Sequence, residues 1–238
     1  MRKLLVFLLL VLFVSIVSSC GGSGLPTFGA EMGVQANPVP GQDSIRIAYS
    51  DMISYYGYVK PGAAPDETRD GKKFYYLYVW IPLVAPEIGI RMISPVFKGM
   101  EPAKGDFVSP LYPENKADVE NYFDTWISWE RALEVINPED IATKAKTTKW
   151  LLFDQNDDSS ELPAQPSGSK YNSVLRIVSS PSDPLKSLIR GLYRIGFTTY
   201  KVGEVKGSFL AQVGAPIKIP GVAISASIDE VSAAATAK

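Results

Sequence analysis

Apolar and polar residues alternate with a period of two along several short segments, a pattern typical of β-strands. Residues 44–49 show it most clearly, and residues 55–59 are aromatic and β-prone. Further segments of this kind are 73–81, 90–93, 123–129, 174–178, 192–200 and 205–213. Turn signals such as Pro61-Gly62 and Asp70-Gly71 separate them. The pattern predicts a mainly β fold, an antiparallel sandwich or a jelly roll.

The segment 73–81, KFYYLYVWI, is apolar or aromatic on both of its faces. One face carries Phe74, Tyr76, Tyr78 and Trp80, and the other carries Tyr75, Leu77, Val79 and Ile81. This pattern predicts a strand that is covered on both sides, or covered on one side and presented on the other. Core packing explains the aromatic residues more simply than a binding face does.

Two short peripheral helices are also predicted, each from a proline that follows a capping residue. Asn137 precedes Pro138, and Asp183 precedes Pro184. Gly191 gives the second helix a stop signal. The small residues of segment 224–238 predict a weak helix or a frayed end.

The N-terminus has the pattern of an export signal, with a basic start and an apolar run from Leu4 to Val17. The run is too short for a membrane span, which needs roughly 20 residues. Val17-Ser18-Ser19-Cys20 resembles a bacterial lipoprotein signal, and Cys20 is the only cysteine of the chain. The alternative is a plain secretory signal with an incidental cysteine.

The lipoprotein interpretation divides the chain into four parts. Residues 1–19 are the signal peptide, and 20–40 are the lipidated N-terminus and a flexible tether. Residues 41–223 form one β-sandwich domain, followed by the tail 224–238. Cys20 would carry a diacylglyceryl thioether and an acyl chain such as palmitate, and two or more chains anchor stably. Gly21, where an aspartate would be a retention signal, favours the outer membrane.

Composition excludes several kinds of chemistry. The 238 residues include no histidine and one cysteine, so the chain has no Ser-His-Asp triad, no histidine metal ligand and no internal disulfide. A net charge of −1 gives no electrostatic reason to expect nucleic-acid binding. Removing Arg2 and Lys3 with the signal leaves 22 basic and 25 acidic residues, a net charge of −3. Oxygen ligands and aromatic surface remain.

The most acidic segment is residues 154–161, DQNDDSSE. Its first residues match the start of a calcium-binding EF-hand loop, but Ser159 stands where glycine is required and Gln165 where glutamate is required. From these residues alone a solvated acidic loop is the simpler interpretation. Catalytic motifs are weak throughout, and no pair of carboxylates is singled out for glycoside hydrolysis. We therefore expect that the protein is not an enzyme.

Longer stretches carry a family resemblance that covers roughly residues 53–222. They are YYGYVKPG (55–62), YYLYVWIP (75–82), RMISP (91–95), FDTWI (123–127), KYNS (170–173) and RGLYRIGFTTYKVGEVKGSF (190–209). In these stretches the chain resembles the family of the leptospiral major outer-membrane surface lipoprotein. The resemblance implies an antiparallel jelly-roll β-sandwich with a few short peripheral helices.

The resemblance also implies a Ca²⁺ site. Its ligands would be Asp124 and Thr125 of FDTWI, Asp157 and Asp158 of the acidic segment, and the backbone carbonyl of Tyr171. An all-oxygen donor set suits a hard cation and disfavours zinc or copper. The acidic run of the leptospiral protein has more consecutive aspartates, whereas Gln155 and Asn156 interrupt it here. This difference concerns the affinity for Ca²⁺.

For function, the resemblance implies a lipid-anchored outer-membrane protein at the cell surface. Some family members bind laminin, collagen and fibronectin, so we expect an adhesion or matrix-binding module that could form a homodimer. Here the segment after Val222 is shorter and poorer in charge than the long helical tail that is linked to matrix binding in the leptospiral protein. The alternatives are a structural coat lipoprotein and, less favoured, a carboxylate-based envelope glycan hydrolase.

Overall fold

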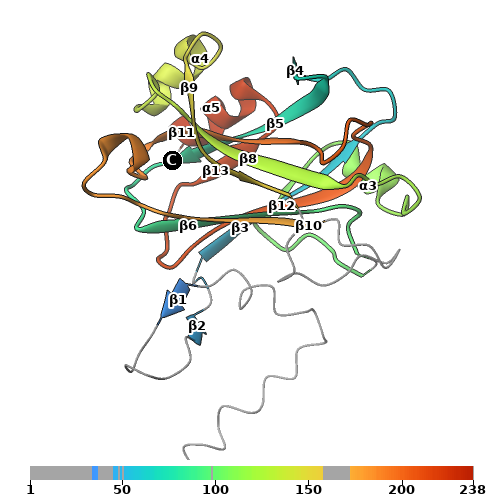
Figure 1. Ribbon diagram of the computed structural model, residues 1–238, viewed down its shortest axis with the longest axis horizontal. Helices are drawn as coiled ribbons and strands as arrows, with labels where there is room; N and C mark the ends of the chain where they lie inside the picture. The colour runs from blue at the N-terminus through green and yellow to red at the C-terminus, as the bar shows by residue number, and fades with distance from the viewer. Residues whose placement is uncertain are drawn as a thin grey trace, which may run out of the picture.

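The structure is a computed structural model that describes residues 34–36, 45–47, 49, 51–97, 99–157 and 172–237 (Figure 1). The signal peptide 1–19, the lipidation site Cys20, and the predicted ligands Asp158 and Tyr171 lie outside these residues. In the part that the structure describes, no helix has the length and apolar character needed to cross a bilayer.

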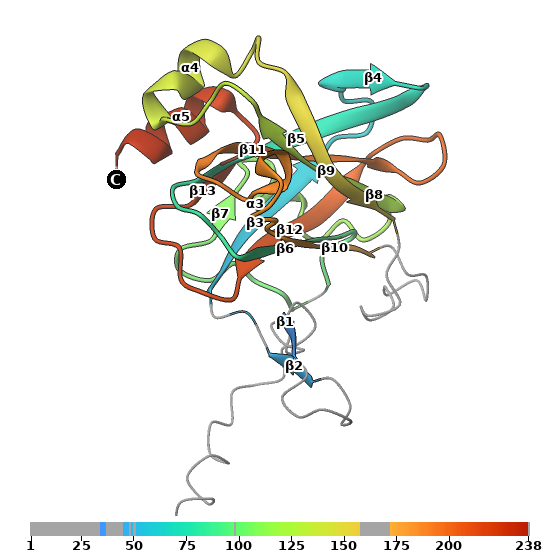
Figure 2. The ribbon, with the colours of Figure 1, turned by 60° about the vertical axis from the view of Figure 1, so that its left-hand side comes forward.

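Two β-sheets pack face to face in the described part of the chain (Figures 1 and 2). The first sheet has the order β10 (Asn172–Val178), β6 (Glu87–Ile93), β12 (Gly207–Ala215), β3 (Asp51–Val59) and β7 (Phe107–Val108). The second has the order β13 (Ala223–Ser225), β5 (Lys72–Ile81), β11 (Gly191–Thr199), β8 (Thr125–Ala132) and β9 (Trp150–Asn156). β4 (Glu67–Arg69) pairs with β5, and β1 (Val34–Ala36) with β2 (Ile45–Ile47).

The strand pairs are antiparallel except for β3 with β7, which is parallel. From β9 to β13 each successive strand lies in the other sheet, which is the connectivity of a jelly roll rather than a meander. The antiparallel β-sandwich predicted from the sequence is confirmed.

β5 shows why the segment 73–81 is apolar on both faces. Its inner side chains, Tyr75, Leu77, Val79 and Ile81, belong to the core between the sheets. On its outer face Trp80 packs in a second cluster together with Val231 of the C-terminal helix. Both faces are therefore covered, and the prediction that these aromatic residues serve packing is confirmed for β5.

Aromatic stacking dominates the core between the sheets. Trp129 of β8 is fully buried and stacks on Tyr193 of β11, with ring centroids 5.0 Å apart and planes 11° from parallel. Phe197 of β11 and Phe209 of β12 pack against each other across the sandwich, with their ring centroids 4.9 Å apart. Stacked and tilted pairs of this kind add about 0.5–1.5 kcal/mol each beyond the area they bury.

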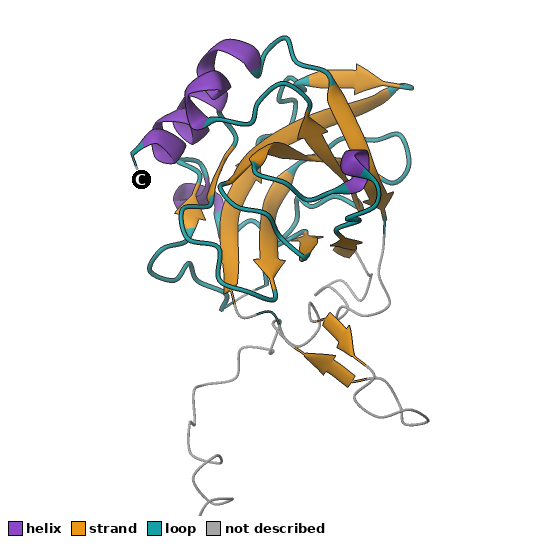
Figure 3. Ribbon diagram, turned by 90° about the vertical axis from the view of Figure 1, so that its left-hand side faces the viewer, coloured by secondary structure: helices purple, strands orange, loops and turns teal. Residues whose placement is uncertain are grey.

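The helices lie at the periphery of the sandwich (Figure 3). They are α3 (Tyr112–Asn115), the 3₁₀ turn Pro138–Asp140 followed by α4 (Ile141–Lys144), the 3₁₀ turn Pro184–Lys186, and α5 (Ile228–Thr236). The start predicted at Asn137 is therefore correct. Asp183 does cap its turn, accepting a hydrogen bond from the Leu185 N–H at 3.0 Å, but no α-helix follows. Gly191 begins β11 instead of ending a helix.

Segment 224–238 was predicted as a weak helix or a frayed end; its residues Ile228–Thr236 form the helix α5, which packs on the sandwich. Ser227 caps α5 by accepting the Glu230 N–H, and Val231 and Ala235 are buried. α5 contacts α4, β13 and β5 and covers the outer face of the second sheet (Figures 2 and 3). Small residues suit this role because they let the helix lie close to the strand beneath it.

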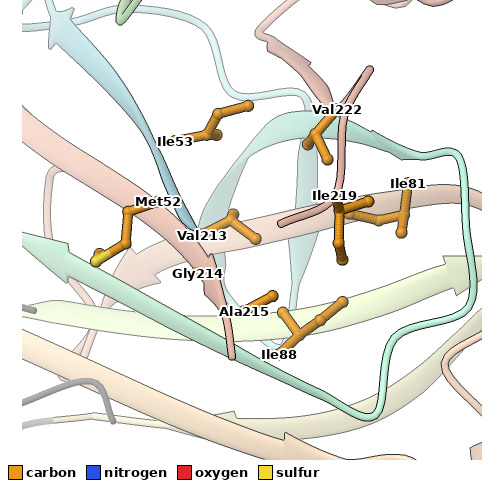
Figure 4. Close-up of a pocket in the computed structure, with 9 residues that line it drawn as sticks. All are labelled: Met52, Ile53, Ile81, Ile88, Val213, Gly214, Ala215, Ile219 and Val222. Carbon is orange, nitrogen blue, oxygen red and sulfur yellow. The ribbon is translucent and has the colours of Figure 1, made fainter. Parts of the chain in front are cut away.

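A small apolar cavity of about 30 Å³ remains at one end of the sandwich (Figure 4). Side chains from β3, β5, β6, β12 and the segment after β12 surround it, among them Met52, Ile88 and Val222. It has room for about one water but offers no polar side chain to hold it. We therefore interpret it as a packing gap and not as a site.

Candidate metal centre

Three segments that are far apart in the sequence meet at one corner of the sandwich. They are the start of β8, the end of β9 and the start of β10. Ile127 of β8 pairs with Asn156 of β9, and the Asn156 side-chain amide donates a hydrogen bond to the Val174 carbonyl of β10 at 2.9 Å. One asparagine side chain therefore joins β9 and β10, which are edge strands of the two sheets.

Thr125, the first residue of β8, is held at this corner by Ser173 of β10. Both side chains are fully buried. The Ser173 hydroxyl donates to the Thr125 carbonyl at 2.8 Å, and the two hydroxyl oxygens lie 2.9 Å apart. Each hydroxyl has one hydrogen. Since the Ser173 hydrogen goes to the carbonyl, the Thr125 hydroxyl must be the donor between them, which leaves its lone pairs free to accept.

Asp124 precedes β8 and is held by the backbone on both sides. Its carbonyl accepts the Tyr200 N–H at 3.0 Å, and its neighbour Phe123 is buried in the core with its N–H donating to the Ser94 hydroxyl at 3.2 Å. The Asp124 residue is half-buried, and its carboxylate oxygen Oδ1 is fully enclosed. A carboxylate in such a position favours a nearby positive charge or hydrogen-bond donor.

Asp157 directly follows β9 and is half-buried. Ile127 of β8 pairs with Asn156, the last residue of β9. Because the two strands are antiparallel, Asp157 is one residue further toward Thr125, the first residue of β8. The neighbouring ligand Asp158 is outside the described residues, as is Tyr171, which precedes the first residue of β10. The structure thus brings the segments carrying the predicted ligands to one corner and describes Asp124, Thr125 and Asp157 themselves.

The donors at the corner are oxygens, namely carboxylates, a hydroxyl and backbone carbonyls. Ca²⁺ takes six to eight such ligands, and this donor set fits it. Within the described residues no group of three acidic, cysteine or histidine side chains forms a metal cluster. A complete coordination shell at this corner would therefore need ligands from the segment 158–171.

Sequence reasoning did not assign roles to Ser173 or Asn156. Ser173 fixes Thr125, and Asn156 joins β9 to β10. Both lie inside segments that had been singled out, the KYNS motif and the acidic run. Their polar side chains at the ends of strands were the available signal, but their partners are 48 and 18 residues away.

A second polar cluster, which the sequence did not predict, lies on the outer face of the second sheet where β8 and β11 pair. Glu130 of β8 is buried and accepts hydrogen bonds from Arg69 (2.9 Å), Arg194 (2.6 Å) and Ser128 (2.9 Å). The Arg194 guanidinium lies between two aromatic rings, 3.8 Å from the centroid of Tyr76 and 4.2 Å from that of Trp150.

Electrostatics explain how Glu130 stays charged in this position. Its burial favours the neutral acid, but the hydrogen bond from Arg69 and the charge of Arg194 outweigh the burial and lower its pKa. The pKa of Glu67 is also lowered, chiefly by its hydrogen bond from Arg69. A general acid in glycoside hydrolysis needs a raised pKa, so these two carboxylates fit a structural role.

Fold and corner together define a β-sandwich protein with an oxygen-lined edge. A family model described as a surface lipoprotein of the Spirochaetales order matches residues 43–224. The chain belongs to this family of surface lipoproteins, as its sequence motifs predicted. No functionally curated protein matches it.

Proposed function

We propose that this protein is a lipid-anchored, Ca²⁺-binding lipoprotein of the outer membrane that acts at the cell surface as an adhesion module for matrix proteins or other ligands, and not as an enzyme. The observation that carries the calcium proposal is the convergence at the corner. Asp124 and Thr125 at β8, Asp157 at β9 and Ser173 at β10 belong to one connected set of strand ends.

The chemistry of the corner supports Ca²⁺ in preference to a transition metal. Asp124, Asp157 and Asp158 would supply charge, Thr125 its hydroxyl, and Tyr171 its backbone carbonyl. With three carboxylates around a dication the local charge is near −1, so the ligands would not repel one another strongly when the ion is bound. When bound, the ion would join the strand ends through shared ligands.

Membership in a surface lipoprotein family supports the anchor and the surface location. The proposed anchor is Cys20, and the outer membrane is the proposed destination. The residues between the anchor and the first strand of the sandwich would act as a tether that lets the domain reach beyond the membrane. A lipid anchor in the outer membrane would leave the β-sandwich domain accessible to ligands.

Adhesion is tested by solid-phase binding of the purified protein to laminin, collagen and fibronectin, with Ca²⁺ and with a chelator. We expect saturable binding to at least one of them. Absence of binding to all three, with Ca²⁺ bound, would favour a structural coat lipoprotein. Turnover of envelope glycans by the pure protein would favour a hydrolase and contradict the proposal.

A further inference from the structure

A larger cavity, of about 440 Å³, is lined by other strands than those that form the candidate metal centre. It opens between β3 of the first sheet and β5 of the second, whereas β8, β9 and β10 form the corner. Its volume is within the range of small-molecule sites, roughly 300–1,000 Å³. Nothing in the proposed calcium and adhesion function uses this cavity.

The inner end of the cavity is aromatic. Tyr55, Tyr75, Phe197 and Phe209 line it, and they stack in pairs, Tyr55 with Phe209 at 6.1 Å and Tyr75 with Phe197 at 5.7 Å. Gly57 makes this packing feasible, because a Cβ there would lie 2.1 Å from the ring of Phe209. The result is a floor of aromatic rings that extends into the core.

The mouth is formed by three segments, which lie within residues 60–66, 109–111 and 226–230. The charges there are mostly negative. Asp66 follows β3, Glu230 lies in the first turn of α5, and Lys60 is the one basic residue among the described lining residues. The Asp66 carboxylate accepts the Tyr76 N–H at 2.8 Å. The Asp66 residue is exposed, and desolvation of its carboxylate by neighbouring groups raises its pKa.

The Glu230 charge acts on the floor of the cavity as well as on its mouth. Burial and then the Glu230 charge raise the pKa of Tyr55 to about 12, so the phenol stays neutral. Ser109 and Ser227 add hydroxyl groups at the mouth. The cavity therefore combines an apolar aromatic interior with an excess of carboxylates over ammonium groups at its opening.

We propose that this cavity binds a small organic cation, with its apolar body against the aromatic floor and its ammonium head at Asp66 and Glu230. The two carboxylates attract the positive charge, and the aromatic floor removes the apolar body from water. An anion with the same body would meet two carboxylates. The excess of negative charge at the mouth thus selects the sign of the ligand.

Calorimetry with three probes that share one alkyl chain tests this proposal: n-octylammonium, 1-octanol and octanoate. The protein is the full chain with Cys20→Ser, which carries no lipid at this position. We expect octylammonium to bind at least about tenfold more tightly than octanol, a difference of about 1.4 kcal/mol. Octanoate should bind most weakly.

Two variants locate the binding. Asp66→Asn with Glu230→Gln keeps one acceptor oxygen on each side chain but removes both charges, and it should lower octylammonium affinity to that of octanol. The control pair Asp70→Asn with Asp229→Asn removes the same charge outside the cavity lining and should leave the affinity unchanged. Ala64→Trp, at an exposed position of the mouth, should reduce the binding of every probe.

The proposal is overturned if none of the probes binds to the folded protein, or if octanoate binds as tightly as octylammonium. Octylammonium binding that survives Ala64→Trp would place the ligand elsewhere and also contradict it. Circular dichroism of each variant shows that the fold is retained before binding is compared.

Discussion

The Ser173 hydroxyl donates to the Thr125 carbonyl at 2.8 Å while the two hydroxyl oxygens lie 2.9 Å apart, so β8 and β10 are joined by a buried pair of hydrogen bonds. This link crosses from one sheet to the other. It holds Thr125 in place before any ion binds, which is the preorganisation that a metal site needs.

Ser173→Ala removes both hydrogen bonds and leaves buried oxygens of Thr125 without this partner. We expect the free energy of unfolding to fall by about 1–3 kcal/mol, measured by urea denaturation. Ser182→Ala is the control, because Ser182 is exposed and bonds only to a neighbouring serine. Equal effects of the two substitutions would mean that the link contributes nothing specific.

Glu130→Gln should destabilise the protein by about 3 kcal/mol, because Arg69 and Arg194 lose their buried counter-charge. The matched control is Glu101→Gln, which breaks the exposed pair with Lys116 and should cost less than about 1 kcal/mol. Urea denaturation of both variants at neutral pH checks the contrast. A cost for Glu130→Gln no greater than that of the control would contradict the structural role of the cluster.

The same cluster predicts a pH dependence. The folded-state pKa of Glu130 is lowered, so its contribution is complete above the unfolded-state pKa of about 4.3 and is lost as pH falls through the lower folded-state value. Stability should therefore decline below about pH 4. Glu130→Gln should flatten that part of the curve, and an unchanged slope in the variant would assign the acid sensitivity to other groups.

Much of the fold follows from short-range pattern. The two-faced segment 73–81 predicted a doubly covered strand, and β5 is one. The helical start at Pro138 was also predictable, although the Asn137 side chain makes no capping hydrogen bond. The docking of α5 was not, because its many small residues give little amphipathic signal and the strand that it covers is far away in the sequence.

The site was predictable only in part, for a similar reason. Family motifs singled out Asp124, Thr125 and Asp157, but periodicity could not pair Thr125 with Ser173 or Asn156 with Val174. Arg194 lay within the predicted strand 192–200 and Glu130 directly after the predicted strand 123–129, and nothing local shows that their side chains meet 64 residues apart. Long-range pairing is what sequence pattern alone does not supply.

Gly57→Ala tests the packing between the sheets. The added Cβ would lie 2.1 Å from the buried Phe209 ring, so the ring must move. We expect a loss of about 1–3 kcal/mol in the free energy of unfolding. Gly203→Ala is the control, because its Cβ would lie 3.5 Å from the Thr199 hydroxyl, and it should change stability by less than about 0.5 kcal/mol. Equal melting temperatures of the Gly57→Ala and Gly203→Ala variants would contradict this account of the packing.

The lipid anchor gives a prediction outside the described residues. In cells fed a labelled fatty acid, Cys20→Ser should carry no label, because the thiol that would receive the lipid is absent. Ser23→Ala, just beyond the proposed cleavage site, should remain labelled. Label that persists on Cys20→Ser would disprove the anchor.

The most direct test of the account is a calorimetric Ca²⁺ titration of the full chain carrying Cys20→Ser. We expect about one ion per chain and a rise in melting temperature with free Ca²⁺. Asp157→Ala with Asp158→Ala should abolish both effects. The control Asp154→Ala with Glu161→Ala removes the same charge from the same acidic segment and should retain them. Undiminished Ca²⁺ binding in the Asp157/Asp158 variant would contradict the proposed site.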